Sequence, residues 1–449
     1  MKNLTRPPLV LIPTYFGCLL FDRRCSRYFP FDQETTQLLR RLVETSLDEV
    51  ILWAVSRQGH EPGAVIGLVE EFYRRGCFRP DGRLAATVLP LDPPADRLPG
   101  PLALHLEVVS ACNLTCSHCF AGQLPRRETP LTLVELDRLF GEMSNLGTFR
   151  LGLTGGEPLL RGDLFELLDA ALGHGLHPCL TTNGLLITDE IARSFGARDL
   201  VWLNISLEGA TRETNDRVRG EGTFDRVLER IKILRRHSRF TLAFTIMRSN
   251  LHEIEDCARL AHDLGAETAV FRPLYPVGTA QSHPELMPTF AEYTDALNRL
   301  SRLEVASDLH AIDPFSPQSR SESRATTLQH HGCGAGNLVC SVSVSGDVNP
   351  CSFLGTRFNA ANLRHHSLEE IWSNSEGFKS IRALPGPDPS HPNQRFSGGC
   401  RARSLAFNGS INAPDPWVEA QSSGDCVQSG RHPLVVLDLT ASAPRSTRP

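Results

Sequence analysis

The segment from residue 103 to about residue 300 alternates strand-like and helix-like patterns, and this limits the possible folds more than any other feature. Short apolar runs, such as LALHLEVV, FRLGLT, PCLTTN, VWLNISL, FTLAFTIM and TAVFRPL, are separated by longer stretches of helical periodicity. Strands that alternate with helices predict a parallel sheet, because each parallel connection needs a crossover. We therefore predict an α/β fold with a partial parallel (β/α)6 barrel. In such folds chemistry lies at the carboxyl ends of the strands.

The segments that flank this region have different patterns. Residues 1–90 place three β-type runs ahead of helical patterns and a short return strand, AATVLP, which predicts a small winged-helix-like module. Residues 91–102, LDPPADRLPGPL, carry prolines and a glycine and predict a linker. Residues 301–426 form a cysteine-rich C-terminal extension, and residues 427–449 predict a disordered tail.

Composition argues against several classes of partner and location. The chain is 41% hydrophobic and 22% charged, as is typical of globular proteins. Its most apolar early stretch, PLVLIPTYFGCLLF, is broken by Pro13 and Gly17 and precedes no cleavage site, so we expect a folded strand pair and a cytoplasmic protein. A net charge of -5 gives no electrostatic reason to expect a nucleic acid or an anionic membrane as partner.

A cysteine cluster follows the first strand of the predicted barrel. The chain has 13 cysteines and no export signal, which favours metal or redox chemistry over disulfides. The stretch CNLTCSHCF contains Cys112, Cys116 and Cys119. A zinc site closed by His118 is one reading, although His118 and Cys119 are adjacent and need an awkward turn to reach one metal. A four-iron cluster held by three thiolates is the other, and it leaves one iron open to a small molecule.

This loop and a second motif resemble those of the radical S-adenosylmethionine (radical SAM) enzymes. The resemblance is carried by the CxxxCxxC loop, closed by the aromatic Phe120, and by LTGGEP after the second strand. It implies that the three cysteines hold a [4Fe-4S] cluster whose open iron binds S-adenosylmethionine. An electron from the cluster would then yield a 5'-deoxyadenosyl radical. It further implies an electron donor such as flavodoxin or ferredoxin as a partner.

Other residues match the family's cofactor-binding positions. Gly155 and Gly156 permit close backbone approach to the methionine ammonium, and Glu157 adds a negative acceptor. In NISLEGATRETNDRVRG, Ser206 and Arg219 match positions that bind the cofactor's carboxylate, for which a guanidinium offers a planar fork of donors. The resemblance thus implies a cofactor-binding set of Phe120, Gly155, Gly156, Glu157, Ser206 and Arg219.

The cysteines of the extension resemble those of the SPASM or twitch domains, which carry auxiliary iron–sulfur clusters. A hairpin signal, VSGDV, is expected to bring distant thiolates together. The resemblance implies one auxiliary [4Fe-4S] cluster held by Cys333, Cys340, Cys351 and Cys400. No cysteine lies between Cys351 and Cys400, so we expect a second auxiliary cluster to be lost. A zinc ion held by the same four thiolates is the alternative, because the ligand count fits both metals.

The N-terminal module narrows the expected substrate. Three short strands followed by helices, ahead of a radical enzyme, resemble the element that captures leader peptides in pathways of ribosomally made, post-translationally modified peptides. It is similar to the small peptide chaperone of pyrroloquinoline quinone synthesis. An exposed strand edge can accept an added peptide strand. We therefore expect a maturase that abstracts hydrogen from a precursor peptide and then forms a cross-link, thioether, epimer or cleaved backbone.

Two other classes of function stay open. One is a radical enzyme that acts on a folded protein or small metabolite, such as a sulfatase maturase or a sugar dehydrogenase. Sulfatase maturases usually carry an acid after the cysteine that matches Cys351, and Ser352 counts against that reading. The other is a non-enzymatic metal-binding protein, which cleavage of S-adenosylmethionine would exclude. No residue stands out as the final hydrogen donor, because these reactions differ in the fate of the substrate radical.

Overall fold

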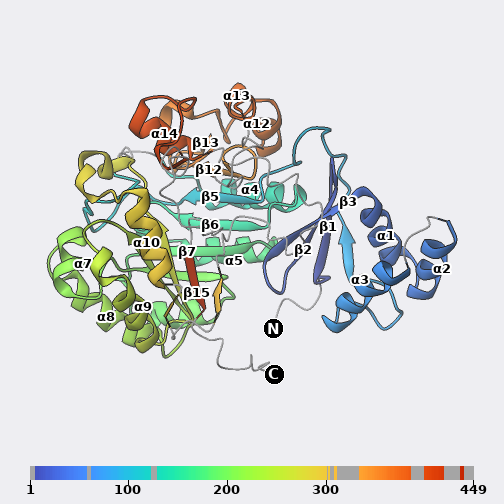
Figure 1. The fold of residues 1–449 in the computed structure, drawn as a ribbon, viewed down its shortest axis with the longest axis horizontal. Helices are drawn as coiled ribbons and strands as arrows, with labels where there is room; N and C mark the ends of the chain where they lie inside the picture. The colour runs from blue at the N-terminus through green and yellow to red at the C-terminus, as the bar shows by residue number, and fades with distance from the viewer. Residues whose placement is uncertain are drawn as a thin grey trace.

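The computed structural model has three parts: an N-terminal module, a barrel and a C-terminal extension (Figure 1). The structure describes residues 6–57, 62–122, 129–300, 302–303, 308–310, 333–385, 399–418 and 435–438. None of the helices in these ranges has the length and hydropathy of a membrane span.

The N-terminal module is a four-stranded sheet of order β3-β2-β1-β4 with three helices. Its elements are β1 (Leu9–Thr14), β2 (Gly17–Asp22), β3 (Arg27–Asp32), α1 (Gln33–Glu44), α2 (Leu47–Arg57), α3 (Pro62–Arg74) and β4 (Ala86–Val88). The first three strands are antiparallel, and β4 pairs in parallel with β1. The order of strands, helices and return strand agrees with the sequence prediction, which missed α2. The likeness to a winged helix stays a prediction.

Two strands of this module are buried on both faces. Leu9, Leu11 and Leu20 point into a core with the module's own helices. Val10 and Phe21 point the other way, into the core of the barrel. Successive side chains of a strand face opposite sides, so an unbroken apolar run serves two cores at once. The early apolar stretch is therefore a strand pair, as expected, and it joins the module to the barrel.

The barrel consists of six consecutive parallel strands, as predicted. They lie in the order β5-β6-β7-β8-β9-β10, with helices between them. The strands are β5 (Ala103–Glu107), β6 (Arg150–Thr154), β7 (His177–Thr182), β8 (Trp202–Ser206), β9 (Thr241–Ile246) and β10 (Thr268–Pro273). The helices are α4 (Leu133–Asn145), α5 (Leu164–Gly173), α6 (Asp189–Gly196), α7 (Arg212–Arg219), α8 (Thr223–Leu234), α9 (Ile254–Asp263) and α10 (Phe290–Leu300). Short 3-10 helices are η1 (Pro158–Leu160), η2 (Leu251–Glu253), η3 (Gly278–Ser282) and η4 (Pro284–Leu286).

A strand near the C-terminus corrects the prediction of a disordered tail over residues 427–449. β15 (Val435–Asp438) pairs antiparallel with β10 and with β11 (Asp308–His310). An open barrel leaves the outer edge of its last strand unpaired, and the VVLD segment, which begins with two β-branched valines, supplies a partner for it. The rest of the predicted tail lies outside the described residues.

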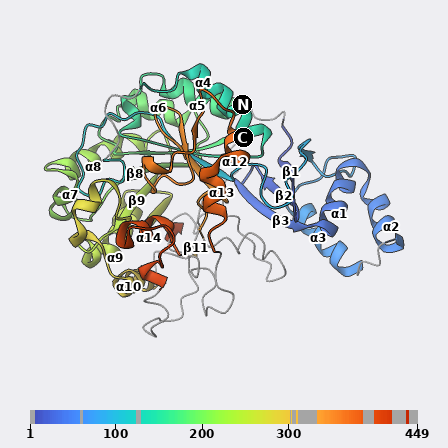
Figure 2. The same ribbon diagram turned by 90° about the horizontal axis from the view of Figure 1, so that it is seen from above.

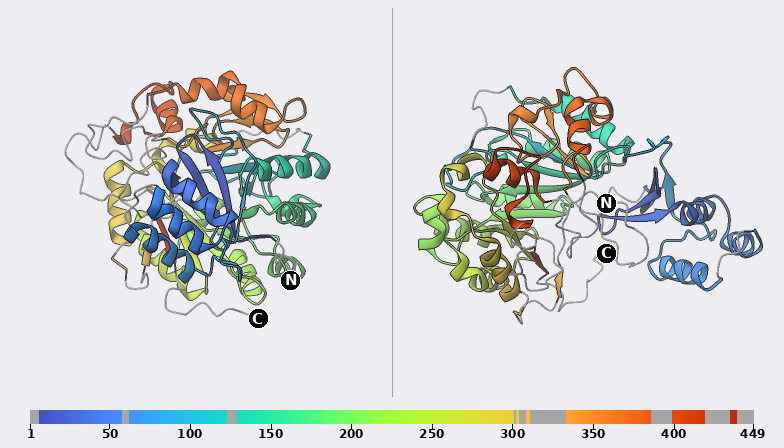
Figure 3. Two further views of the ribbon diagram at one scale, coloured as in Figure 1. Left: turned by 90° about the vertical axis from the view of Figure 1, so that its right-hand side faces the viewer. Right: turned by 45° about the horizontal axis from the view of Figure 1, so that its top comes forward.

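The extension continues the barrel sheet beyond β5. β12 (Val339–Val342) pairs in parallel with β5, and the predicted hairpin is formed by β12 and β13 (Asp347–Asn349). The remaining elements are η5 (Thr356–Phe358), β14 (Ala361–Asn362), α12 (Leu368–Asn374), α13 (Glu376–Arg382) and α14 (Arg401–Asn408). Figure 3 shows these helices in orange and red along one side of the barrel. The extension is therefore built onto the barrel as part of the same sheet.

The module docks on the amino ends of the barrel strands. The Tyr28 hydroxyl lies 3.0 Å from the Leu102 carbonyl and 2.9 Å from the Gly147 carbonyl, and it accepts from the Phe149 N–H at 2.7 Å. The Phe21 ring stacks on Phe149 with centroids 4.7 Å apart. Figure 2 shows α1–α3 standing away from the barrel helices, with β1–β3 between them. The module thus lies at the opposite end of the barrel from the carboxyl ends of its strands.

Candidate cofactor and cluster site

The loop that carries Cys112, Cys116 and Cys119 lies at the carboxyl end of β5, where the sequence predicted chemistry. Hydrogen bonds fix this loop to segments that follow four other barrel strands. They join Gly156 N–H to Val109 O (2.6 Å), Asn183 Nδ2 to Asn113 Oδ1 (2.7 Å), Ser117 N–H to Val218 O (3.1 Å) and Thr279 N–H to Cys119 O (2.8 Å). The fold of the barrel therefore holds the three thiols at one end of the lumen.

The three thiols are unpaired and close enough to influence each other. Cys112 is exposed, Cys116 and Cys119 are half-buried, and none forms a disulfide. Burial raises the pKa of Cys116 to about 11 and also raises the pKa of Cys119, and neighbouring cysteines add to both shifts. Over the described ranges, no three His, Cys, Asp or Glu side chains are spaced to hold a single metal ion. The thiolates of an iron–sulfur cluster bind different irons, so they need not be spaced for one metal ion.

His118, within the cysteine loop, contacts a buried carboxylate. Its Nε2 lies 3.1 Å from Oε1 of Glu208, a carboxylate whose side chain is 2% exposed. The Arg219 Nη1 donates to the same oxygen at 3.1 Å. Burial alone would raise the pKa of Glu208, but His118 and Arg219 hold it below its ordinary value. This pairing commits Nε2 of His118 to a carboxylate, so Nδ1 is the ring nitrogen that a zinc site closed by His118 would have to use.

Two buried nitrogen atoms beside the thiols lack protein partners. They are Nε of Arg219 and Nδ1 of His118, for which the described chain supplies no hydrogen bond. Buried polar groups are nearly always satisfied, by protein, water or ligand. These atoms, the three thiols and the cationic Arg219 together fit a site for a cluster and a carboxylate-bearing cofactor. Ser206, at the end of β8, lies on the same edge of the sheet and is half-buried.

The TGGEP turn after β6 packs on the backbone of the cysteine loop. A Cβ on Gly155 would lie 2.3 Å from the Val109 carbonyl oxygen, and one on Gly156 would lie 2.1 Å from that of Ala111. Gly155 also has φ +131°, a conformation that favours glycine. These glycines are therefore required by close approach of protein backbone, whereas the sequence had explained them by approach of the cofactor.

Glu157 is a buried residue of the TGGEP turn. Its side chain is 1% exposed, and its carboxylate accepts from Thr182 Oγ1 (2.6 Å), the Asn183 N–H (2.8 Å) and the Leu159 N–H (3.0 Å). Burial raises the pKa of this carboxyl against those donors. Glu157 thus ties the end of β7 to the TGGEP turn, and its contact with the cofactor's ammonium stays a prediction.

Phe120 links the cysteine loop to the extension. Its ring meets Phe353 edge-to-face with centroids 5.4 Å apart, and Phe353 stacks on Tyr275 at 4.2 Å. Gly278 packs beneath the same loop, where a Cβ would lie 2.2 Å from the Phe120 carbonyl oxygen. The sequence pointed to Phe120 but not to Gly278, whose signal is its place in the VFRPLYPVG stretch after β10.

Only three of the four extension cysteines predicted as ligands lie together. Cys333, Cys351 and Cys400 pack around one small apolar cluster, and each of the thiols at Cys351 and Cys400 is influenced by Cys333. Burial raises the pKa of Cys400 to about 11 and that of Cys351 further. Cys340 instead lies on β12, 1% exposed, in the main barrel core. The strand period sends its side chain into that core, so the structure does not bring Cys340 to the other three.

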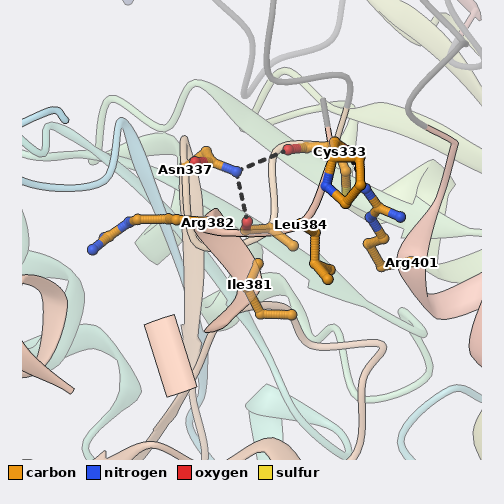
Figure 4. A pocket seen from close by; sticks show the side chains of 8 residues that line it. Cys333, Asn337, Ile381, Arg382, Leu384 and Arg401 are labelled. Carbon is orange, nitrogen blue, oxygen red and sulfur yellow. Dashed lines mark hydrogen bonds between the residues drawn. The ribbon is translucent and has the colours of Figure 1, made fainter. Parts of the chain in front are cut away.

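A small pocket lies beside the auxiliary cysteines. It is lined by Cys333, Asn337, Arg382, Arg401 and apolar neighbours and has a volume of about 120 Å³. Figure 4 shows Asn337 Nδ2 bonded to backbone oxygens beside Cys333, with Arg382 directed away and Arg401 at the far wall. The Arg382 guanidinium instead stacks on Trp372, 4.5 Å from the ring centroid. The pocket therefore adjoins the auxiliary cysteine site at Cys333.

Known proteins share both cysteine-bearing regions. The radical SAM superfamily model matches residues 106–261, and the SPASM model, an iron-sulfur cluster-binding domain, matches residues 333–401. The AdoMet-dependent heme synthase of Methanosarcina barkeri is 32% identical over 340 residues, which cover 71% of this chain and 96% of that protein. The chain belongs to the radical SAM superfamily. As a radical SAM enzyme, it uses S-adenosylmethionine with a [4Fe-4S] cluster, and its SPASM region binds auxiliary iron–sulfur.

Two further similarities concern peptide maturation. The mycofactocin maturase MftC of Mycobacterium ulcerans is 30% identical over 358 residues, which cover 78% of this chain and 94% of that protein. Streptococcus suis SuiB, solved with S-adenosylmethionine and with its precursor peptide SuiA, has the same fold with a TM-score of 0.67. The SuiA-bound structure is 14% identical, and the match covers 91% of this radical SAM chain and 98% of SuiB.

Proposed function

We propose that this radical SAM enzyme modifies a residue of a ribosomally made precursor peptide. The observation that carries the proposal is the sheet module with an open strand edge, fused to a barrel whose cysteine loop is built for S-adenosylmethionine. The relatives named as mycofactocin maturase, and the fold shared with SuiB, support it. The proposed parts are the peptide-recognition module (1–90), linker (91–102), radical SAM barrel (103–300) and auxiliary-cluster extension (301–426).

The module offers its outer strand to a peptide. β3 pairs with β2 alone, so its other edge is open in the described structure. Pro30 sits within β3, which is typical of an edge strand. Its Phe29 ring lies 5.9 Å from the Arg75 guanidinium, at the end of α3. A leader peptide added beside β3 would gain main-chain hydrogen bonds there, with specificity from such neighbouring side chains.

The barrel lumen offers polar groups to the peptide residue that reacts. Arg272 on β10 has no hydrogen-bond or ion-pair partner among the described residues. It acts electrostatically on Cys179 of β7, and β8 and β9 separate these two strands, so the two side chains face each other across the lumen. Asn204 is fully buried on the same face and leaves its Oδ1 without a partner. These groups suit a substrate that brings a carboxylate and an amide N–H.

The chain's residues would bind the two clusters and S-adenosylmethionine, and these bound groups would supply the radical chemistry. Cys112, Cys116 and Cys119 would hold the cofactor's cluster, and Arg219 and Ser206 would hold the carboxylate of S-adenosylmethionine. When bound, the cluster and S-adenosylmethionine together supply a carbon radical able to abstract hydrogen. Cys333, Cys351 and Cys400 would hold the auxiliary cluster. A flavodoxin or ferredoxin is the proposed electron donor. The chain's own part is to orient one C–H bond and keep water away from it.

Co-expression tests the proposal directly. The enzyme is produced with the peptide encoded by a small open reading frame beside its gene, and the peptide is analysed by mass spectrometry. A mass change that depends on Cys112, Cys116 and Cys119 supports the proposal. An unchanged peptide, with S-adenosylmethionine still cleaved, would contradict it.

A small metabolite is the second candidate substrate. The 32% identity to a protein named AdoMet-dependent heme synthase favours it. That match leaves more than a quarter of this chain without a counterpart, since it covers 71%. The open β3 edge has no evident use in an enzyme for a small metabolite, and the co-expression experiment distinguishes the two.

A further inference from the structure

One buried carboxylate connects the cysteine loop to the proposed cofactor ligand. Glu208 follows β8, and its Oε1 accepts from Arg219 Nη1 and lies within 3.1 Å of His118 Nε2. Its Oε2 accepts from the Thr245 N–H at 2.7 Å. The Glu208 backbone is held too, because its N–H donates to Asn215 Oδ1 at 3.2 Å. Glu208 therefore has little freedom to move.

This contact decides which side of Arg219 is available. A guanidinium can present two adjacent N–H groups to a planar carboxylate. Glu208 occupies Nη1, while Nε is buried and has no partner in the described chain. The Nε and Nη2 side is thus the one left for a second carboxylate. The Arg219 side chain is 6% exposed, so bulk water reaches little of it.

The same carboxylate also fixes the cysteine loop. His118 stands between Cys116 and Cys119, and its ring is 13% exposed. Since Glu208 binds His118 and Arg219 through one oxygen, the two side chains are held at one fixed separation. The thiols beside His118 and the guanidinium of Arg219 are positioned together as a result.

We propose that Glu208 is a positioning residue of the cofactor site. It orients Arg219 so that its Nε and Nη2 receive the carboxylate of S-adenosylmethionine, and it ties that guanidinium to the cysteine loop through His118. This inference rests on the assignment of Arg219 to the cofactor and is independent of whether the substrate is a peptide.

Two ligands test the proposal by binding alone. Reconstituted wild-type and Glu208→Gln enzymes are titrated by calorimetry with S-adenosylmethionine and with its decarboxylated analogue, which lacks the carboxylate. Loss of the orienting contact should weaken the binding of S-adenosylmethionine at least about tenfold and the binding of the analogue less than about twofold. The reason is that a charge-assisted bond is lost only for S-adenosylmethionine. The matched control is Glu253→Gln. This buried carboxylate caps the start of α7 through Thr211 and Thr214, and the structure gives it no contact with His118 or Arg219.

The outcomes separate positioning from a merely structural role. Equal weakening of both ligands, or unchanged affinity for S-adenosylmethionine, would overturn the proposal. If Glu208→Gln yields no folded protein, Glu208→Asp and His118→Gln replace it. Glu208→Asp should weaken the binding of S-adenosylmethionine only. His118→Gln keeps an N–H for Glu208, so this variant should bind both ligands nearly as wild type does. The electron paramagnetic resonance signal of the reduced cluster gives a second readout, and its change on adding S-adenosylmethionine should be smaller in Glu208→Asp.

Discussion

The Phe120 ring meets the Phe353 ring edge-to-face, with centroids 5.4 Å apart. Phe120 directly follows Cys119, and Phe353 lies two residues after Cys351. The two cysteine sites are therefore joined by a direct packing contact, and Tyr275 extends it by stacking on Phe353. We expect a substrate bound over the lumen to have this aromatic group as one wall.

Phe353→Leu should loosen the packing between the two cysteine sites. Loss of two aromatic contacts should cost about 1–2 kcal/mol of unfolding free energy. We also expect less product for each S-adenosylmethionine cleaved, because the wall that holds the substrate is looser. Calorimetry and the ratio of product to 5'-deoxyadenosine check this. Phe358→Leu, in the same extension but stacked on Arg357, is the control that should keep the ratio. A ratio unchanged in Phe353→Leu would contradict the prediction.

Replacing Cys112, Cys116 and Cys119 together by alanine should remove one cluster and abolish 5'-deoxyadenosine formation. The reason is that the open iron of this cluster is where S-adenosylmethionine is expected to bind. Iron analysis should show a loss of about four irons per chain. Retained cleavage of S-adenosylmethionine in this triple variant would refute the cofactor site.

The auxiliary cysteines give a prediction in which sequence and structure disagree. The sequence assigns Cys340 as a ligand, whereas the structure buries it in the main core, apart from Cys333, Cys351 and Cys400. Wild-type protein with two clusters should hold about eight irons. Cys351→Ala should lose about four of these irons, and Cys340→Ala should keep all of them at a small cost in stability. An equal loss of iron in both variants would restore Cys340 to the ligand set. Zinc in place of iron at the extension cysteines would support the zinc alternative.

The difference at Cys340 shows what the sequence was able to predict. Strand and helix alternation is local, so it predicted six barrel strands and the hairpin of the extension. The cysteine loop and TGGEP were found because their residues are close along the chain. Glu208 was missed because its importance comes from His118 and Arg219, which approach it only in the folded protein. Cys340 was assigned as a ligand because its spacing fits one, while the period of β12 decides where the side chain points.

His177 should make the protein less stable in mild acid. Burial and the nearby Arg23 and Arg150 lower the pKa of His177 to about 3, from the ordinary 6.5. The unfolded chain therefore takes up this proton between about pH 6.5 and pH 3 while the folded protein does not, so stability falls as the pH falls. At pH 5 the loss is at most about 2 kcal/mol from this group. His177→Gln should show a smaller drop in melting temperature between pH 7.5 and pH 5 than wild type, and an equal drop would argue against this origin.

The docking of the module changes how recognition has to be tested. Phe21 and Ile12 belong to the barrel core, and Arg150 donates to the Ser26 carbonyl across the junction. Deleting residues 1–90 would expose that core and destabilise the barrel, so a truncated enzyme does not separate binding from catalysis. Changes in the substrate are the better probe.

The peptide must reach from one end of the barrel to the other. The module contacts the amino ends of β5 and β6, while the cysteine loop follows the carboxyl end of β5, Ala103–Glu107. Five strand residues span about 17 Å, and an extended peptide covers at most ~3.6 Å per residue, so the spacer between leader and modified residue needs at least about five residues. Precursors with a shorter spacer should bind normally and stay unmodified, while a spacer lengthened by a few residues should cost little. Binding is measured by fluorescence anisotropy of a labelled precursor, and modification by mass spectrometry. Full modification of a precursor without a spacer would show that the leader does not bind at this module.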